Sequence, residues 1–335
     1  MRCEVSEAGY RVRGTVRRAS DARRVGHLRA AAGGGALELV EADLVESPQG
    51  VWDAAAEGCE LVCHVASPFD TGSHSRDFFL GAAVGGTEKV LRAAAKAGAR
   101  RVCVTSSCAA VSEGFGKAES RGRTFSAGDW SREAQCQPYS LSKIVAERRA
   151  RALAKGGDEE LEGAPQLVTV NPSYVQGGAL SGRKDYASLA LVRELLAGKV
   201  PALARMSLNV CHIDDVAAIH VAALTRGESG GRYIVDGGPV WMTSVASWLR
   251  DEYAPKGFTK VPSLVAPSFV VKIIALCDSN AASVAGRLDC EKFHDSSPAE
   301  ALLGRPLRRP REAIMDAAEA CVQGGLVTPT AQARQ

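Results

Sequence analysis

The stretch LVCHVASPFDTGSHSRDFFLGAAVGGTEKVLRAAAKAGARRVCVTS, residues 61–106, holds two short apolar runs on either side of a long alanine-rich segment. The runs at residues 61–66 and 101–106 are rich in valine, whereas residues 78–99 have the composition of a helix. A strand, a helix and a second strand in this order are typical of a βαβ unit with parallel strands. Both runs are nearly all apolar, which indicates strands covered on both faces of a sheet.

The same alternation continues on both sides of this unit. β-Branched runs occupy residues 10–16, 37–42 and 167–172, and a second helix-prone segment covers residues 140–156. Repeated strands and helices of these lengths predict an α/β fold with a doubly wound, parallel, Rossmann-type sheet.

After residue 171 this regularity weakens, and strand-like and helical pieces become interleaved. We therefore expect a dinucleotide-binding domain over residues 1–175 and a smaller C-terminal substrate lobe over residues 176–335. Residues 208–240, which hold the strand-like runs NVCHIDD and GRYIVD, are expected to return to the main sheet. A ligand crevice would then lie between the lobe and the carboxyl ends of the strands.

The composition excludes several classes of function. With 335 residues, 46% of them hydrophobic, the chain can bury a large core. Its 41 basic and 38 acidic residues leave a net charge of +3 and form no basic stripe, so we expect no nucleic-acid partner. No run of about 18 apolar residues occurs, so we expect no membrane segment and a cytoplasmic location.

The most apolar run is VPSLVAPSFVVKIIALC at residues 261–277, which contains two prolines and a lysine. Proline interrupts helix interiors, and a lysine is costly at the centre of a bilayer. The run therefore predicts a buried helix better than a membrane span, with a helix that touches a membrane as the alternative.

The ten cysteines are scattered, with no CxxC pair and no His/Cys cluster at the spacing of a zinc site. We interpret them as reduced thiols, most of them buried, and expect no metal site. His64 and His212 have no metal partner nearby in the sequence, and we interpret them as structural histidines.

The sequence YSLSK, residues 139–143, is the strongest signal of catalysis. Residues four apart share one face of a helix, so the phenol of Tyr139 and the ammonium of Lys143 can point into one cleft. A nearby ammonium stabilises the phenolate and lowers the phenol pKa, which allows the tyrosine to give or take a proton near neutral pH. The alternative is a solvated tyrosine and lysine on a helix surface.

A serine pair lies at the end of the second apolar run, in the sequence Thr105-Ser106-Ser107. Doubly wound folds bind ligands at the carboxyl ends of their strands. A serine hydroxyl at this place can hydrogen-bond a substrate oxygen and hold it against Tyr139. The alternative role is a helix N-cap or a turn. With the YxxxK pair, this serine predicts a catalytic site.

The beginning of the chain looks like the end of a helix, because residues 6–9, SEAG, finish on a typical glycine cap. In a dinucleotide fold, a strand and a glycine-rich loop precede that helix and hold the pyrophosphate. GGG at residues 33–35 precedes a strand and GG at residues 85–86 falls within a helix, so neither replaces the loop. We expect a sheet that lacks its first strand and glycine loop.

Seven motifs follow one another along the chain: GYRVRGTVRR at 9–18, ADL at 42–44, HVASPF at 64–69, VTSSCAAV at 104–111, PYSLSKIVAE at 138–147, NPSYVQG at 171–177 and CHIDDVAAIHV at 211–221. In this order the chain resembles the extended short-chain dehydrogenase/reductases. It is most similar to their dihydroflavonol reductase and cinnamoyl-CoA reductase group. The resemblance covers nearly the whole chain after residue 8.

The resemblance implies a catalytic set of Ser107, Tyr139 and Lys143, with Lys143 also bonding the nicotinamide ribose. The implied reaction reduces a small aldehyde or ketone to an alcohol, or runs in reverse, with the proton supplied by Tyr139. The implied partners are a small-molecule carbonyl or alcohol substrate and, by analogy, a second copy in a homodimer.

The resemblance also implies the cofactor NADP(H). Arg17 matches the contact to the adenosine 2′-phosphate, with Arg24 as a weaker helper. A guanidinium suits a phosphate, whereas an acidic residue would bond the ribose hydroxyls of NAD. The alternative for Arg17 and Arg18 is a solvated charge pair.

Other implied cofactor contacts fall at strand ends, where ordinary packing is the alternative. They are Asp43 and Leu44 beside the adenine, Val65, Ala66 and Ser67 beside the ribose, and Pro172 and Ser173 beside the nicotinamide.

Two departures from the family pattern matter. The missing first strand and glycine loop favour an incomplete or alternatively spliced product of an enzyme, and leave open a pseudoenzyme or binding protein without cofactor turnover. Ala83 stands where many short-chain enzymes place an asparagine that supports a proton relay, which fits the reductase group.

An NAD-dependent sugar-nucleotide epimerase or dehydratase is a further alternative, although near the serine only Glu113 offers an extra acid or base.

Overall fold

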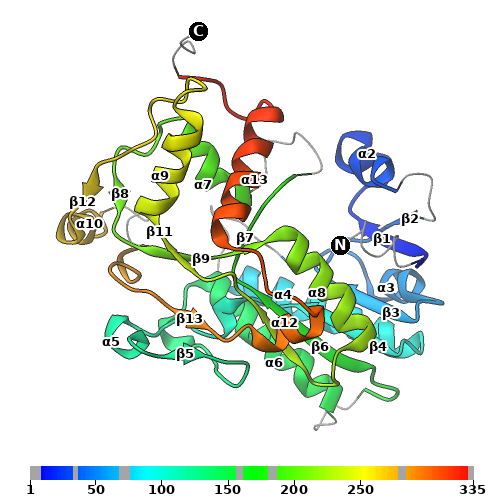
Figure 1. The fold of residues 1–335 in the computed structure, drawn as a ribbon. Helices are drawn as coiled ribbons and strands as arrows, with labels where there is room; N and C mark the ends of the chain where they lie inside the picture. Colours follow the sequence, from blue (N-terminus) through cyan, green and yellow to red (C-terminus); the bar gives the residue numbers. More distant parts are fainter. Residues whose placement is uncertain are drawn as a thin grey trace.

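The computed structural model describes residues 9–32, 37–67, 76–155, 161–179, 187–277 and 284–330. The centre of the fold is a four-stranded parallel sheet in the order β10-β6-β4-β3, of which Figure 1 labels β3, β4 and β6. The α/β class and the predicted strands at 61–66, 101–106 and 167–172 are confirmed. The strands of this sheet are β3 (Leu61–His64), β4 (Arg101–Thr105), β6 (Gln166–Pro172) and β10 (Arg232–Val235).

The first two strands form a small parallel sheet of their own. β1 (Val12–Val16) pairs with β2 (Leu37–Glu41), as the β-branched runs predicted. Among the described residues neither strand is paired with the four-stranded sheet, so β1 and β3 each have one unpaired edge. The Arg13 guanidinium links β1 to α3 (Gln49–Ala56) and the turn after it, by donating to the carbonyls of Ala55 (3.2 Å) and Glu57 (2.7 Å).

Residues 6–8 carry the prediction of a helix end and a lost first strand, and they lie outside the described residues. So does the glycine cluster at residues 33–35. The absence of the first strand and its loop therefore stays a prediction. The other glycine pair, residues 85–86, lies within a helix as expected.

Helices cover both faces of the main sheet. Side chains alternate between the two faces of a strand, so a strand that is apolar throughout needs a helix on each face to bury them. Val102 and Val104 pack against α4 (Arg76–Lys96) and α6 (Pro138–Lys155). Cys103, between them, packs on the opposite face against α8 (Ile213–Arg226). α12 (Ser297–Leu303) in turn covers α8 and β10. The sheet is therefore doubly wound.

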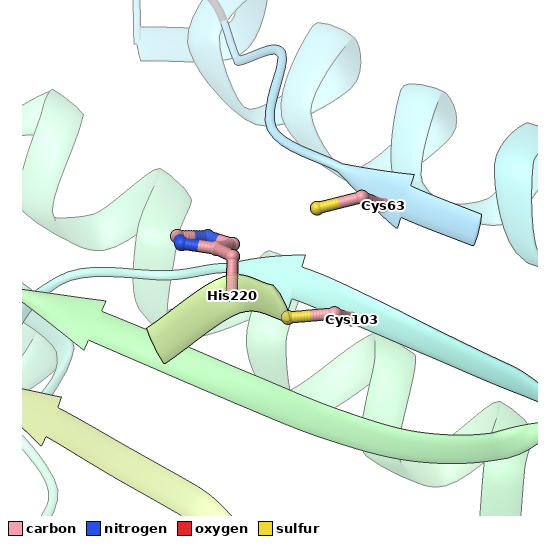
Figure 2. Close-up of side chains that lie close together, drawn as sticks. All are labelled: Cys63, Cys103 and His220. Atoms are coloured by element: carbon pink, nitrogen blue, oxygen red, sulfur yellow. The ribbon is translucent and has the colours of Figure 1, made fainter. Parts of the chain in front are cut away.

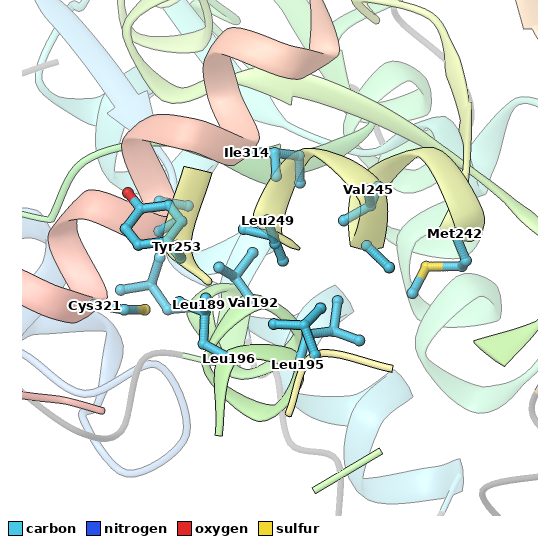
Figure 3. Packing of buried hydrophobic residues seen from close by; sticks show 14 of the residues in the cluster. Leu189, Val192, Leu195, Leu196, Met242, Val245, Leu249, Tyr253, Ile314 and Cys321 are labelled. Atoms are coloured by element: carbon cyan, nitrogen blue, oxygen red, sulfur yellow. The ribbon is translucent and has the colours of Figure 1, made fainter. Parts of the chain in front are cut away.

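The C-terminal lobe is built on a second sheet, in which β9 lies between β7 and β11. β7 (Tyr174–Gln176) runs parallel to β9 (Ser207–His212), and β11 (Pro239–Trp241) runs antiparallel to it. Figure 3 shows how the apolar side chains of the lobe's helices meet in one core. These helices are α7 (Ala187–Leu196), α9 (Met242–Tyr253) and α13 (Pro310–Gln323).

Residues 208–240 are shared between the two sheets. β10 pairs with β6 in the main sheet, and α8 packs on that sheet. β9 and β11 belong to the sheet of the lobe instead. The chain therefore crosses from the lobe to the main sheet through α8, which joins the two parts.

The remaining elements are short and connect these layers. These elements are α2 (Ala22–Ala30), η1 (Cys108–Ala110), α5 (Lys117–Ser120), β5 (Thr124–Phe125), η2 (Glu133–Gln135), β8 (Leu203–Ala204), β12 (Val265–Ala266), α10 (Ser268–Ile274) and β13 (Phe293–His294). β13 pairs with β5, and β12 pairs with β8, each in a two-stranded sheet.

The prediction of a buried helix in residues 261–277 is wrong. α10 is short and buries Val271, whereas Phe269 and Ile273 are more than half exposed. Hydrophobicity favours burial, but α10 lies at the rim of the lobe, where one face of the helix meets the protein (Figure 1). Among the described residues, no helix combines the length and the apolar composition needed to cross a membrane.

Candidate active site

Ser107 lies just beyond β4, at the carboxyl edge of the main sheet. Its hydroxyl oxygen accepts a hydrogen bond from the Ala109 N–H (3.1 Å) and so caps the short helix η1. The same hydroxyl lies 3.4 Å from the carbonyl of Pro172, at the end of the adjacent strand β6. Ser107 therefore caps a helix and also belongs to the candidate site, since its side chain contacts Tyr139.

Tyr139 and Lys143 lie one turn apart on the first turns of α6. The Tyr139 phenol shares a hydrogen bond with Ser107. The Lys143 ammonium lies 6.0 Å from the centre of the Tyr139 ring and donates to the carbonyl of Thr105 (3.0 Å), the last residue of β4. The structure therefore brings the three predicted catalytic residues together where β4 ends and α6 begins.

Burial dominates the electrostatics of this group. It raises the pKa of Tyr139 above its ordinary value, and the hydrogen bond with Ser107 acts in the opposite direction without cancelling it. Burial also lowers the pKa of Lys143 to about 8, although the nearby Glu147 carboxylate opposes that shift. The prediction that Lys143 lowers the Tyr139 pKa is wrong for the protein alone. The desolvated phenol is the stronger effect, and the ammonium is directed at the Thr105 carbonyl.

A small pocket opens beside Lys143, between the main sheet and the helices α4 and α6. It is lined by Ala66 and Ser67 after β3, by Ala83 and Thr87 of α4, and by Lys143. Two of the predicted ribose contacts thus lie around the same space as the predicted catalytic lysine. Val65, the third, is 44% exposed just beyond β3, so a bound molecule can reach the end of this strand.

The predicted contacts to the adenosine end lie beyond β1 and β2. Arg17 is exposed just after β1, and its charge helps to lower the pKa of the Asp43 carboxyl. A hydrogen bond from the Glu46 N–H is the larger cause of that shift, because Asp43 caps the turn that follows β2. Arg24 is exposed and forms an ion pair with Asp21 (3.3 Å). The structure places Arg17 and Asp43 together, and Arg24 on the next helix.

Leu44 and Ser173 have structural contacts at the predicted positions. A Cβ at Gly86 would lie 2.8 Å from Leu44 Cδ2, so glycine allows Leu44 to pack directly on α4. The backbone N–H of Ser173 donates to the Val235 carbonyl (3.0 Å) at the end of β10. Pro172 is buried beside Ser107.

These residues fit a dinucleotide in part. The exposed Arg17 guanidinium suits a phosphate, and the exposed end of β3 leads into the pocket beside Lys143. A glycine-rich strand-to-helix turn, which would cradle a pyrophosphate, does not occur among the described residues.

A family model described as "NAD dependent epimerase/dehydratase family" matches residues 3–236. The chain belongs to this family. Tetraketide alpha-pyrone reductase 1 of Arabidopsis thaliana is 32% identical over 271 residues, with 76% of this chain and 79% of the relative covered. Cinnamoyl-CoA reductase 1 of Petunia hybrida is 34% identical, with 68% and 66% covered. The resemblance to the dihydroflavonol and cinnamoyl-CoA reductase group is confirmed.

Solved structures show the same fold as this member of the epimerase/dehydratase family. The crystal structure of gox2253 has a TM-score of 0.77 at 25% identity, covering 97% of this chain and 94% of that one. Yeast methylglyoxal/isovaleraldehyde reductase Gre2, complexed with NADPH, has a TM-score of 0.77 at 23% identity, covering 96% and 94%. At that identity the second likeness concerns the fold alone.

The two predicted structural histidines have protein partners. His64 is buried with its Nε2 3.3 Å from the Thr87 hydroxyl, and burial lowers its pKa to about 4. His212 caps α8 by accepting from the Asp214 N–H (3.1 Å), and its Nε2 lies 3.0 Å from a carboxylate oxygen of Asp316.

Glu147 was missed by the sequence analysis. It follows Lys143 by one more turn of α6 and is buried, with the Ser106 hydroxyl and the Asn171 side-chain amide donating to its carboxylate. The Arg232 guanidinium of β10 donates to the same carboxylate (2.8 Å). A signal was available, because residues 139, 143 and 147 are spaced by four and share one helix face.

Proposed function

We propose that this member of the epimerase/dehydratase family is an NADP(H)-dependent oxidoreductase that reduces a small aldehyde or ketone to an alcohol, or catalyses the reverse reaction. The observation that carries the proposal is the Ser107–Tyr139 hydrogen bond, with Lys143 one turn further along the same helix. A proton donor, a second hydroxyl and a buried cation are thus placed at the carboxyl ends of parallel strands, where doubly wound folds bind ligands.

Each residue has a distinct role in the proposed mechanism. The Ser107 hydroxyl donates a hydrogen bond to the carbonyl oxygen of the substrate and polarises the carbonyl. The Tyr139 hydroxyl gives its proton to the same oxygen as negative charge develops there. Because burial raises the Tyr139 pKa, the phenol holds its proton at neutral pH, which suits the direction of reduction. When bound, the nicotinamide cofactor supplies the hydride.

Lys143 and Arg17 would hold the two ends of the cofactor. The Lys143 ammonium borders the same pocket as Ala66 and Ser67, within reach of a ribose bound over the end of β3. Arg17 offers an exposed guanidinium for a 2′-phosphate. Yeast Gre2, a reductase of the same fold bound to NADPH, and the reductases among the relatives support this proposal.

The test is an assay of the purified chain with NADPH and a panel of small aldehydes and ketones, followed by the loss of NADPH absorbance. Cofactor binding is measured separately by fluorescence titration. We expect Tyr139→Phe to reduce kcat by about 10²–10⁴-fold, the usual effect of removing a general acid, with little change in the NADPH Kd. Turnover that survives this substitution would refute the proposed role of Tyr139.

A second candidate function is a binding protein without cofactor turnover. It is favoured by the separation of β1 and β2 from the main sheet among the described residues. The same titration is repeated on a chain extended at its N-terminus by a strand and a glycine-rich turn. Binding of NADPH by the extended chain alone would make the present chain an incomplete enzyme, and binding by neither would favour the second candidate.

A further inference from the structure

Three potential metal ligands converge on the face of the main sheet that is covered by α8. Cys63 of β3 and Cys103 of β4 are register partners in neighbouring strands, so their side chains leave the sheet side by side. His220 of α8 lies over them (Figure 2). One ligand atom from each of the three residues lies within 4.8 Å of the other two.

The imidazole of His220 is held in the tautomer that a metal requires. Its Nδ1 lies 2.7 Å from the carbonyl of Val216, and a carbonyl can only accept, so Nδ1 carries the proton. Nε2 therefore has a free electron pair, which accepts from the Thr105 hydroxyl at 2.7 Å. A backbone carbonyl that fixes the far nitrogen is the usual support of a metal-binding histidine.

The two thiols favour a divalent ion. Cys103 is fully buried, and Cys63, its register partner on β3, is half-buried beside it. The surroundings are apolar and include Val168, Val170 and Ile219. The two negative charges of two thiolates neutralise a divalent ion, and a neutral imidazole adds none. A monovalent ion would leave a buried negative charge, which is costly.

The dimensions and the access route also suit such an ion. Zinc binds sulfur at about 2.3 Å and imidazole nitrogen at about 2.0–2.1 Å in tetrahedral sites, so small side-chain rotations would close this triangle around it. Cys63 is half-buried on β3, which has an unpaired edge among the described residues. Because Cys63 is partly exposed, its thiol is the ligand of the three that solvent reaches most readily.

We propose that Cys63, Cys103 and His220 form a binding site for a soft divalent cation of the zinc type. Binding forms two metal–sulfur bonds and one metal–nitrogen bond and releases two thiol protons to solvent, with no change of oxidation state. It also takes Nε2 away from Thr105, whose carbonyl holds Lys143. The metal site does not depend on the proposed function. In a chain that has the proposed activity, an occupied site would affect Lys143 through Thr105.

The test is a titration of the full chain with Co²⁺, a spectroscopic substitute for zinc, under a phosphine reductant that keeps the thiols reduced. We expect one equivalent to give thiolate-to-cobalt charge-transfer absorption in the near ultraviolet and tetrahedral bands in the visible. Zinc should displace the cobalt, and two protons should be released for each ion in weakly buffered solution.

Cys63→Ala and Cys103→Ala should each weaken Co²⁺ binding at least tenfold, and His220→Phe should remove the tetrahedral bands. Cys59→Ala, which changes another half-buried cysteine two residues before β3, is the matched control and should bind like the wild type. Cys63 is only half-buried, so Cys63→Ala remains informative even where a change at the fully buried Cys103 prevents folding, as judged by circular dichroism. Absence of the charge-transfer band in the wild type, or Co²⁺ binding by Cys63→Ala with the affinity of the wild type, would overturn the proposal.

Discussion

Glu147 of α6 and Arg232 of β10 form a buried ion pair of 2.8 Å that joins the helix carrying Tyr139 and Lys143 to the far edge of the main sheet. We expect Glu147→Ala to lower the free energy of unfolding by about 3–5 kcal/mol, because the Arg232 charge would stay buried without its partner. Denaturant unfolding measures the change. The control is Glu60→Ala, which breaks the exposed pair with Arg100 and should cost at most about 1 kcal/mol. Equal effects of the two substitutions would contradict this account.

Ser107 has two roles that substitutions can separate. Ser107→Ala removes both the cap of η1 and the hydroxyl beside Tyr139, so it should cost about 1 kcal/mol of stability and most of the activity. Ser107→Asn keeps a capping oxygen, and its stability should stay closer to that of the wild type while activity remains low. Unfolding curves and NADPH oxidation rates distinguish the two effects. High activity in Ser107→Asn would show that the hydroxyl is not used in the reaction.

Arg17 should determine the choice of cofactor. In Arg17→Glu the guanidinium that faces the proposed 2′-phosphate is replaced by a carboxylate, so the Kd for NADPH should rise by about ten- to one-hundredfold, as expected for a charged hydrogen bond. The Kd for NADH should change much less. Fluorescence titration with both cofactors measures this ratio. The control Arg23→Glu alters another exposed arginine, on α2, and an equal loss there would point to a general effect of charge.

Lys143 should make stability depend on pH in the alkaline range. Its pKa is about 8 in the folded protein and 10.5 when unperturbed, so between these values the unfolded chain binds more protons. Stability therefore rises with pH across this window, by up to about 3 kcal/mol, relative to Lys143→Met, which has no such proton. Denaturant unfolding of both proteins from pH 7 to 10.5 tests the slope. A difference that stays constant with pH would mean that the lysine is not desolvated.

Gly86 should be intolerant of even a methyl group. Gly86→Ala would push a Cβ to within 2.8 Å of Leu44 Cδ2, and overpacking of this kind typically costs about 1–3 kcal/mol. Gly85→Ala has open space around its Cβ and should stabilise α4 by about 0.5–1 kcal/mol. Thermal unfolding of the pair gives opposite shifts in Tm if the close packing of Leu44 on α4 is correct.

The sheet and the grouping of the candidate site residues were predictable because their signals are local. Strands such as Arg101–Thr105 are short and have an apolar centre, and Tyr139 and Lys143 share a helix face by their spacing alone. The Tyr139 pKa was mispredicted because desolvation depends on the whole surroundings, which the spacing does not reveal. The exposure of α10 was missed for a related reason, since an apolar composition does not say whether a neighbouring element is present to cover it.

The clusters formed by distant residues could not be predicted. Glu147 and Arg232 are 85 positions apart, and Cys63, Cys103 and His220 come from three elements that meet only through the sheet order. Spacing rules detect ligands on one helix or one loop. A metal site between two strands and a crossing helix leaves no such spacing in the sequence.

The separation of β1 and β2 from the main sheet bears on how the protein opens. Among the described residues, the backbone of residues 12–41 is not paired with any strand of the four-stranded sheet. The contacts that hold it include the hydrogen bonds from Arg13 to α3 and to the turn that follows α3. We therefore expect this unit to detach without disrupting the core around β4 and β6. Its amide hydrogens would therefore exchange with solvent through local opening, at a lower free energy than those of the central strands, and proteases would reach it first.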